Sequence, residues 1–184
     1  MKTYLLKMLF FTTSLCLLSC SNDETDKSDT TAIAGSYTLI AMTSNISVDL
    51  NDDGILSTDL LLETDPGFFN SDKPELEIKT GIVDKELVQL MNFYLPHPTL
   101  TSVPGSAKKV INYSRGGVGY PYTFNNVTKE ISVEKDVKVS GFGRMDNIQV
   151  AGENKLGAII TKYYYDFAIE AWRELTITCK YARI

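Results

Sequence analysis

The sequence contains little histidine and little cysteine. Its 184 residues include one histidine, His97, and three cysteines. These numbers exclude histidine-rich metal sites, four-cysteine zinc sites and scaffolds held together by several disulfides. The chain also lacks a basic block, because its 18 Lys and Arg residues are outnumbered by 23 Asp and Glu residues, which gives a net charge of −5. Binding to a phosphate backbone depends on clustered cations, so we expect no nucleic-acid partner.

The remaining composition is typical of a folded domain. Hydrophobic residues make up 43% of the chain, charged residues 22% and aromatic residues 10%. That content is sufficient for an apolar core, and the length favours one domain. No group of residues has the spacing of a catalytic site, and we therefore expect a protein that is not an enzyme.

The N-terminal residues are organised like a signal peptide. Residues 1–19 begin with Lys2 and Lys7 and continue into an apolar run that is too short for a membrane span of about 20 residues. The run ends in Leu-Leu-Ser-Cys at positions 17–20. This ending resembles the lipobox of bacterial lipoproteins, which implies cleavage before Cys20 and a lipid on Cys20 that anchors the chain to a membrane. The alternative is an ordinary secretory signal followed by an unmodified Cys20.

A polar segment follows Cys20. Residues 21–31 carry no bulky apolar side chain, so they cannot bury enough surface to offset the entropy of ordering the chain. We therefore expect residues 20–34 to form a lipidated cysteine and an acidic, flexible tether. Asp23 and Glu24 resemble the export signal of some Gram-negative surface lipoproteins, which implies the outer membrane, at its periplasmic face or at the cell surface.

From Gly35 onward, apolar residues alternate with polar ones, as in β-strands that have one wet face. About eight strands in about 150 residues predict an all-β domain over residues 35–184, built as an antiparallel barrel or as a two-layer β-sandwich. Breaks between strands are expected at Pro96-His97-Pro98 and at Gly116-Gly117, and a short helical turn is expected between Thr58 and Glu63. The strands are predicted at 35–42, 75–80, 86–95, 108–114, 120–127, 129–140, 145–150, 156–169 and 174–183.

Three short segments resemble lipocalin-like domains. Gly35-Ser36-Tyr37 resembles the G-x-W motif at the start of these domains, and residues 180–184 are similar to their last strand. Residues 49–61 resemble a segment of lipocalin-like lipoproteins of unknown function. The resemblance implies a barrel that binds a small apolar ligand. Aromatic side chains such as Tyr120 and Trp172 would then line a cavity, whereas in a filled core they would pack against each other and the domain would act as an accessory module for a surface partner.

The most distinctive local feature is an acidic loop. Oxygen-bearing side chains occupy its first, third, fifth and ninth positions, and glycine occupies the sixth. This spacing matches the calcium loop of EF-hands, in which the seventh residue supplies a main-chain carbonyl. The segment from Ser57 to Leu60 also resembles dockerin calcium loops. The candidate ligands of Ca²⁺ are Asp49, Asn51, Asp53, Ile55, Ser57 and Asp59.

The end of this loop departs from the EF-hand pattern. The twelfth position, which should be acidic, is Leu60. The bidentate ligand must therefore be Asp59, Glu63 from the following turn, or absent. The alternative structure is an Asx-rich turn, in which Asn51 and Asp53 bind local amides and Gly54 has a positive φ.

Cys179 and His97 are the two remaining residues with reactive side chains. Cys179 lies in a segment in which every second residue is apolar, which indicates a buried thiol on a strand. His97 is the only histidine available to activate that thiol, and its position between two prolines favours a surface loop.

Overall fold

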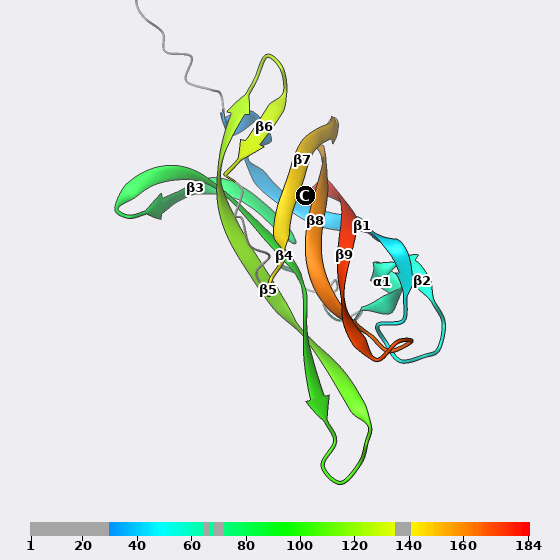
Figure 1. The fold of residues 1–184 in the computed structure, drawn as a ribbon. Coiled ribbons are helices and arrows are strands. Elements are labelled where there is room, and N and C mark those ends of the chain that lie inside the picture. The colour runs from blue at the N-terminus through cyan, green and yellow to red at the C-terminus, as the bar shows by residue number, and fades with distance from the viewer. Residues whose placement is uncertain (1–29, 65–66, 68–71, 135–140) are drawn as a thin grey trace, which may run out of the picture.

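The computed structural model of the chain describes residues 30–64, 67, 72–134 and 141–184 (Figure 1). The predicted signal peptide, Cys20 and most of the predicted tether lie outside these residues, as does the end of the strand predicted at 129–140. The elements are η1 (Thr30–Ile33), β1 (Gly35–Val48), β2 (Ser57–Asp59), α1 (Leu60–Glu63), β3 (Leu76–Val83), β4 (Glu86–Ser102), β5 (Lys109–Asn125), β6 (Glu130–Val133), β7 (Arg144–Gly152), β8 (Lys155–Asp166) and β9 (Ala171–Arg183).

The strands form one antiparallel sheet of nine strands in the order β6-β5-β4-β3-β1-β9-β8-β7, with β2 paired to β1. If the short β2 is left aside, most strands pair with the strand that precedes or follows them in the chain. The exception is the pairing of the first strand, β1, with the last strand, β9. The sheet curls so that β4 and β5 face β8 (Figure 1). Tyr164 Oη donates to Pro96 O at 2.9 Å, and Lys109 Nζ donates to Tyr165 Oη at 2.7 Å. This arrangement confirms the predicted antiparallel, all-β class.

The break predicted at Pro96-His97-Pro98 is wrong, because β4 continues through it and pairs with β5. The N–H of Tyr94 points to the β3 side of β4, where it donates to Glu75 O at 2.8 Å. Pro96 and Pro98 lie two and four residues after Tyr94 in the strand, so their backbone nitrogens face the β3 side too. The pairing of β3 with β4 ends at Phe93, so no ladder hydrogen bond is lost there and proline is tolerated.

The break predicted at Gly116-Gly117 is also wrong, because both residues lie inside β5. A Cβ atom at Gly116 would lie 2.5 Å from Cδ1 of Phe142, and one at Gly117 would lie 2.4 Å from Cδ1 of Tyr94. These glycines therefore make room for aromatic rings that cross the strand. They do not form a turn.

The inside of the curled sheet is filled with the chain's own side chains. Phe93 and Tyr120 stack with their ring centroids 5.9 Å apart, and Tyr164 from β8 is fully buried in the same core. Burial of apolar surface at about 25 cal/mol per Å² makes such packing the main source of stability. Trp172, by contrast, is 47% exposed on the outside. Other fully buried side chains of this core are Met42, Leu76, Met91, Leu95, Met145, Leu175, Ile177 and Tyr181.

The helices η1 and α1 span four residues each. In the part of the chain that the structure describes, no helix is long and apolar enough to cross a membrane. The short α1 agrees with the helical turn predicted between Thr58 and Glu63.

Candidate functional site

The acidic loop follows β1 and wraps around the carboxylate of Asp49. Asp49 Oδ1 accepts the N–H of Asp52 at 2.8 Å, and its Oδ2 accepts the N–H of Gly54 at 3.0 Å. Asn51 Oδ1 accepts the N–H of Asp53 at 3.1 Å. Gly54 has the positive φ of 78° that the Asx-turn alternative predicts. Side-chain oxygens therefore hold the loop together through local amides.

The structure brings some of the predicted calcium ligands together. Asn51 Nδ2 donates to Asp53 Oδ2 at 3.1 Å, beside the amides that surround Asp49. Ser57 and Asp59 are engaged elsewhere, because Ser57 Oγ accepts the N–H of Asp59 and the Asp59 carboxylate caps α1. Ile55 donates its N–H to Asp53 Oδ1 at 2.7 Å and has a side chain that is 66% exposed. Among the described residues, no group of three or more His, Cys, Asp or Glu side chains is placed to hold a metal ion.

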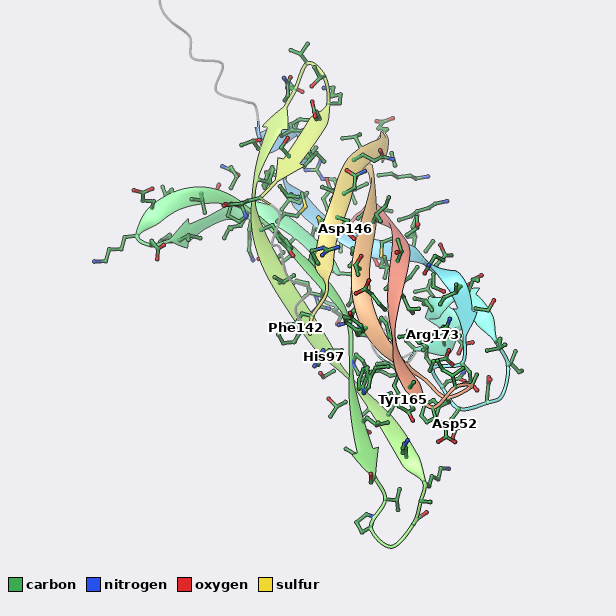
Figure 2. All side chains as sticks on the ribbon, viewed as in Figure 1. Asp52, His97, Phe142, Asp146, Tyr165 and Arg173 are labelled. Carbon is green, nitrogen blue, oxygen red and sulfur yellow. The ribbon has the colours of Figure 1, made fainter. Side chains whose placement is uncertain are left out.

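Two buried carboxylates from other segments fix this loop to the domain. Glu63 Oε2 accepts the N–H of Leu50 at 2.9 Å, and Asp166 Oδ1 accepts the N–H of Asp49 at 3.2 Å. Arg173 Nη1 donates to Asp166 Oδ2 at 2.9 Å, which pairs the buried charge of Asp166. Burial raises the pKa of Glu63, while the hydrogen bond from Leu50 N–H acts in the opposite direction and the nearby carboxylates of Asp53, Asp49 and Asp166 raise it further. Figure 2 shows Asp52 of the loop and Arg173 on the same side of the molecule.

Sequence reasoning considered Glu63 as a metal ligand and missed Asp166 and Arg173. The sequence signal for Asp166 is weak: it shares a buried face of β8 with Ala158 and Tyr164, but Tyr165 on the opposite face is buried as well. A charged residue on a buried face needs a partner of opposite charge. Arg173 supplies it from β9, on the other side of the β8–β9 hairpin.

Cys179 is a buried thiol on β9, as its sequence context predicts. Burial raises its pKa to about 12, although a hydrogen bond with Tyr181 acts in the opposite direction. His97 lies in strand β4, so the predicted loop is wrong, and its side chain is half-buried. Its Nδ1 lies 2.9 Å from Gly141 O and its ring packs against Phe142 (Figure 2). The two reactive side chains are therefore held by separate partners.

Lys162 is a second buried ionisable group that sequence reasoning missed. Its side chain is fully buried on the core face of β8, where Nζ donates to Gly141 O at 2.7 Å and lies 5.5 Å from the centre of the Tyr164 ring. Within the described residues Lys162 has no ion pair. Burial disfavours the charged form and lowers the pKa of Lys162 to about 8.

Three hollows on the surface of the described residues bear on function. The first, of about 420 Å³, lies beside the acidic loop and is bordered by Glu63, Lys109 and Phe167. The second, of about 400 Å³, lies between η1 and the turn that joins β7 to β8. The third, of about 540 Å³, lies over β7, β8 and β9. None of these was predicted from the sequence, because each combines segments that are distant in the chain.

No protein-family model matches this sequence, and no curated protein or solved structure is significantly similar to it.

Proposed function

We propose that this protein is a lipid-anchored, non-enzymatic interaction module of the bacterial outer membrane, which meets its partner through the outer surface of its β-domain. The filled interior carries this proposal. Phe93 and Tyr164 are fully buried members of one packed core cluster inside the sheet, which is where a small apolar ligand would have to sit. A ligand inside the sheet, the other expectation from the sequence, would have to displace such side chains at a cost of several kcal/mol.

The proposed anchor is a lipid on Cys20. Each buried methylene of an acyl chain contributes about 0.8 kcal/mol, so two or more chains hold a folded domain at a bilayer without a spanning helix. The polar residues that follow Cys20 then act as the tether, and the β-domain begins at Gly35.

Fractionation of cells that express the full chain tests the anchor. The wild-type protein is expected in the outer-membrane fraction, and Cys20→Ser is expected in the soluble fraction of the envelope. Cys179→Ser is the matched control, because it removes the same atom from a buried position and should leave the protein in the membrane. Equal distribution of wild type and Cys20→Ser would refute the lipid anchor.

We also propose that Ca²⁺ binds weakly to the first half of the acidic loop. Asp49, Asn51 and Asp53 lie on one turn and carry hard oxygen atoms of the kind that Ca²⁺ prefers, and these oxygens accept N–H groups of the same loop. Because Ser57 and Asp59 are engaged elsewhere, the affinity is expected to lie near the weak end for extracellular calcium modules, with Kd about 1 mM.

A further inference from the structure

The third hollow lies on the outer face of the sheet, and its floor is a glycine. Gly157 lies in the middle of a row that crosses three strands, with Gln149 of β7 on one side and Lys180 of β9 on the other. The next row contains Asn147, Ile159 and Thr178. A hollow of about 540 Å³ lies over these two rows with Gly157 on its floor, and we call it the Gly157 groove.

A glycine at this position is unfavourable for the strand alone. Glycine inside a strand costs about 0.5–1 kcal/mol relative to alanine, and it often marks a bulge, a tight bend or a place where a ligand or another backbone approaches closely. Gly157 does not have a positive φ, so the backbone does not require it. A Cβ atom there would lie 3.7 Å from Ala151 Cβ and 3.9 Å from Gln149 Cγ, which are ordinary contacts. The fold would therefore accept a side chain at position 157.

Irregular pairing shapes both sides of the groove. The register between β1 and β9 shifts between Leu39 and Ala41, and the extra residue, Ile40, borders the groove with a side chain that is 47% exposed. The register between β7 and β8 also shifts, once before Asn147 and once after Val150. Such β-bulges redirect side chains and are frequent next to binding sites.

The polar side chains around the groove have unused hydrogen-bonding groups. Asn147, Gln149 and Thr178 make no side-chain hydrogen bond to any described part of the chain, although they are exposed and close together. Some polar residues elsewhere on the same face are paired. For example, Arg144 Nε donates to Oδ1 of Asp146 at 2.7 Å (Figure 2). The groove therefore offers amide and hydroxyl groups that can both donate and accept hydrogen bonds.

The charge of the groove is opposite to that of the whole protein. Lys155 and Lys180 border it, and no Asp or Glu of the described residues does. The full chain nevertheless has more acidic than basic residues. Local positive charge of this kind attracts an anion and forms charge-assisted hydrogen bonds with it.

We propose that the Gly157 groove binds an acidic saccharide, with a sugar carboxylate at Lys180 and sugar hydroxyls at Asn147, Gln149 and Thr178. The flat C–H face of the ring would lie on Gly157 and Ile159. An acidic peptide fits less well, because a peptide strand adds to a sheet edge and the backbones here are already paired on both sides in the centre of β8 and β9. This inference rests on the proposed outer-surface function and names its partner by chemical class.

Binding to the full-length protein, purified from membranes in detergent, tests the inference. The probe is a linear tetramer of galacturonic acid, measured by titration calorimetry. Its fully methyl-esterified form, which is neutral, is expected to bind about tenfold more weakly, and so is the acidic tetramer with Lys180→Met. Lys85→Met removes an exposed lysine at the β3–β4 turn and should leave the affinity unchanged.

Filling the groove provides the second part of the test. Gly157→Val should abolish binding, and Gly157→Ala should weaken it, while both variants stay folded by circular dichroism. Thr176→Val, on the same face of β9 but outside the groove, is the matched control and should bind as wild type does. Unchanged binding by Gly157→Val and Lys180→Met would overturn the proposal. So would equal binding of the acidic and esterified tetramers, or tighter binding of a tetraglutamate peptide than of the acidic tetramer. Membrane fractionation of the same protein reports on the anchor separately, so failure of the saccharide site is distinguishable from failure of the proposed anchor.

Discussion

Replacing Lys162 with methionine should stabilise the folded protein at neutral pH. The Lys162 side chain is fully buried and has Gly141 O as its hydrogen-bond acceptor. Burial lowers its pKa from 10.5 to about 8. Below pH 8 the charged amine is held in the core at a cost, whereas the unfolded chain keeps it in water. Methionine has a similar length and fills the same space without a charge.

The size and the pH dependence of the effect follow from the two pKa values. A difference of about 2.5 units corresponds to about 3 kcal/mol of destabilisation below pH 8, at 1.36 kcal/mol per unit. Loss of the hydrogen bond to Gly141 O offsets about 1 kcal/mol, which leaves a net gain of about 2 kcal/mol for Lys162→Met at pH 7. Between pH 8 and 10.5 the unfolded state binds the proton that the folded state has released, so wild-type stability rises with pH relative to the variant. At pH 9.5 the remaining penalty is about 1.4 kcal/mol, and the two proteins should be nearly equal.

Urea unfolding at pH 7 and at pH 9.5 measures this difference. Tyrosines titrate in the same range, so the informative quantity is the free energy of unfolding of Lys162→Met minus that of wild type at each pH. Lys85→Met, at an exposed turn, should change the free energy by less than about 0.5 kcal/mol at both values. A variant that is less stable than wild type at pH 7, or a difference that does not change with pH, would refute the reasoning.

Three further predictions concern the core, the thiol and the acidic loop. Phe93→Ala removes a fully buried ring stacked on Tyr120 and should lower the free energy of unfolding by about 3–5 kcal/mol in urea; a loss below 1 kcal/mol would show that the ring is not packed. Because burial raises its pKa to about 12, Cys179 should resist iodoacetamide at pH 8 until urea unfolds the chain; rapid labelling of the native protein would contradict its burial. Addition of 10 mM CaCl₂ should raise the melting temperature by about 3–6 °C, from a stabilisation of about 1.4 kcal/mol at a Kd of about 1 mM, and Asp53→Asn should remove most of this rise. The absence of any rise in the wild type would leave the loop as an Asx turn only.

The features that the sequence predicts correctly are those set by neighbouring residues. Alternation identifies the antiparallel β class and the buried side of β9, which includes Cys179. The Asx bonds of the acidic loop connect residues at most five positions apart, so the local pattern of Asp, Asn and Gly is sufficient to predict them.

The features that the sequence does not predict depend on distant residues. Pro96 is tolerated inside β4 because the pairing with β3 ends before it, and Gly116 lies beneath Phe142, which comes from another segment. Asp166 reaches the acidic loop from 117 positions away. From the local sequence, Gly157 indicates only a less stable position within a strand. The groove above it becomes visible only from the register of β7, β8 and β9.

Intact-mass spectrometry of the full protein, purified natively from membranes, tests the central claim most directly. The account predicts the mass of residues 20–184 plus acyl chains on Cys20, and an organic extract that contains no stoichiometric apolar molecule besides bilayer lipids. An unmodified Cys20 would contradict the anchor, and an apolar molecule released in stoichiometric amount would contradict the filled interior.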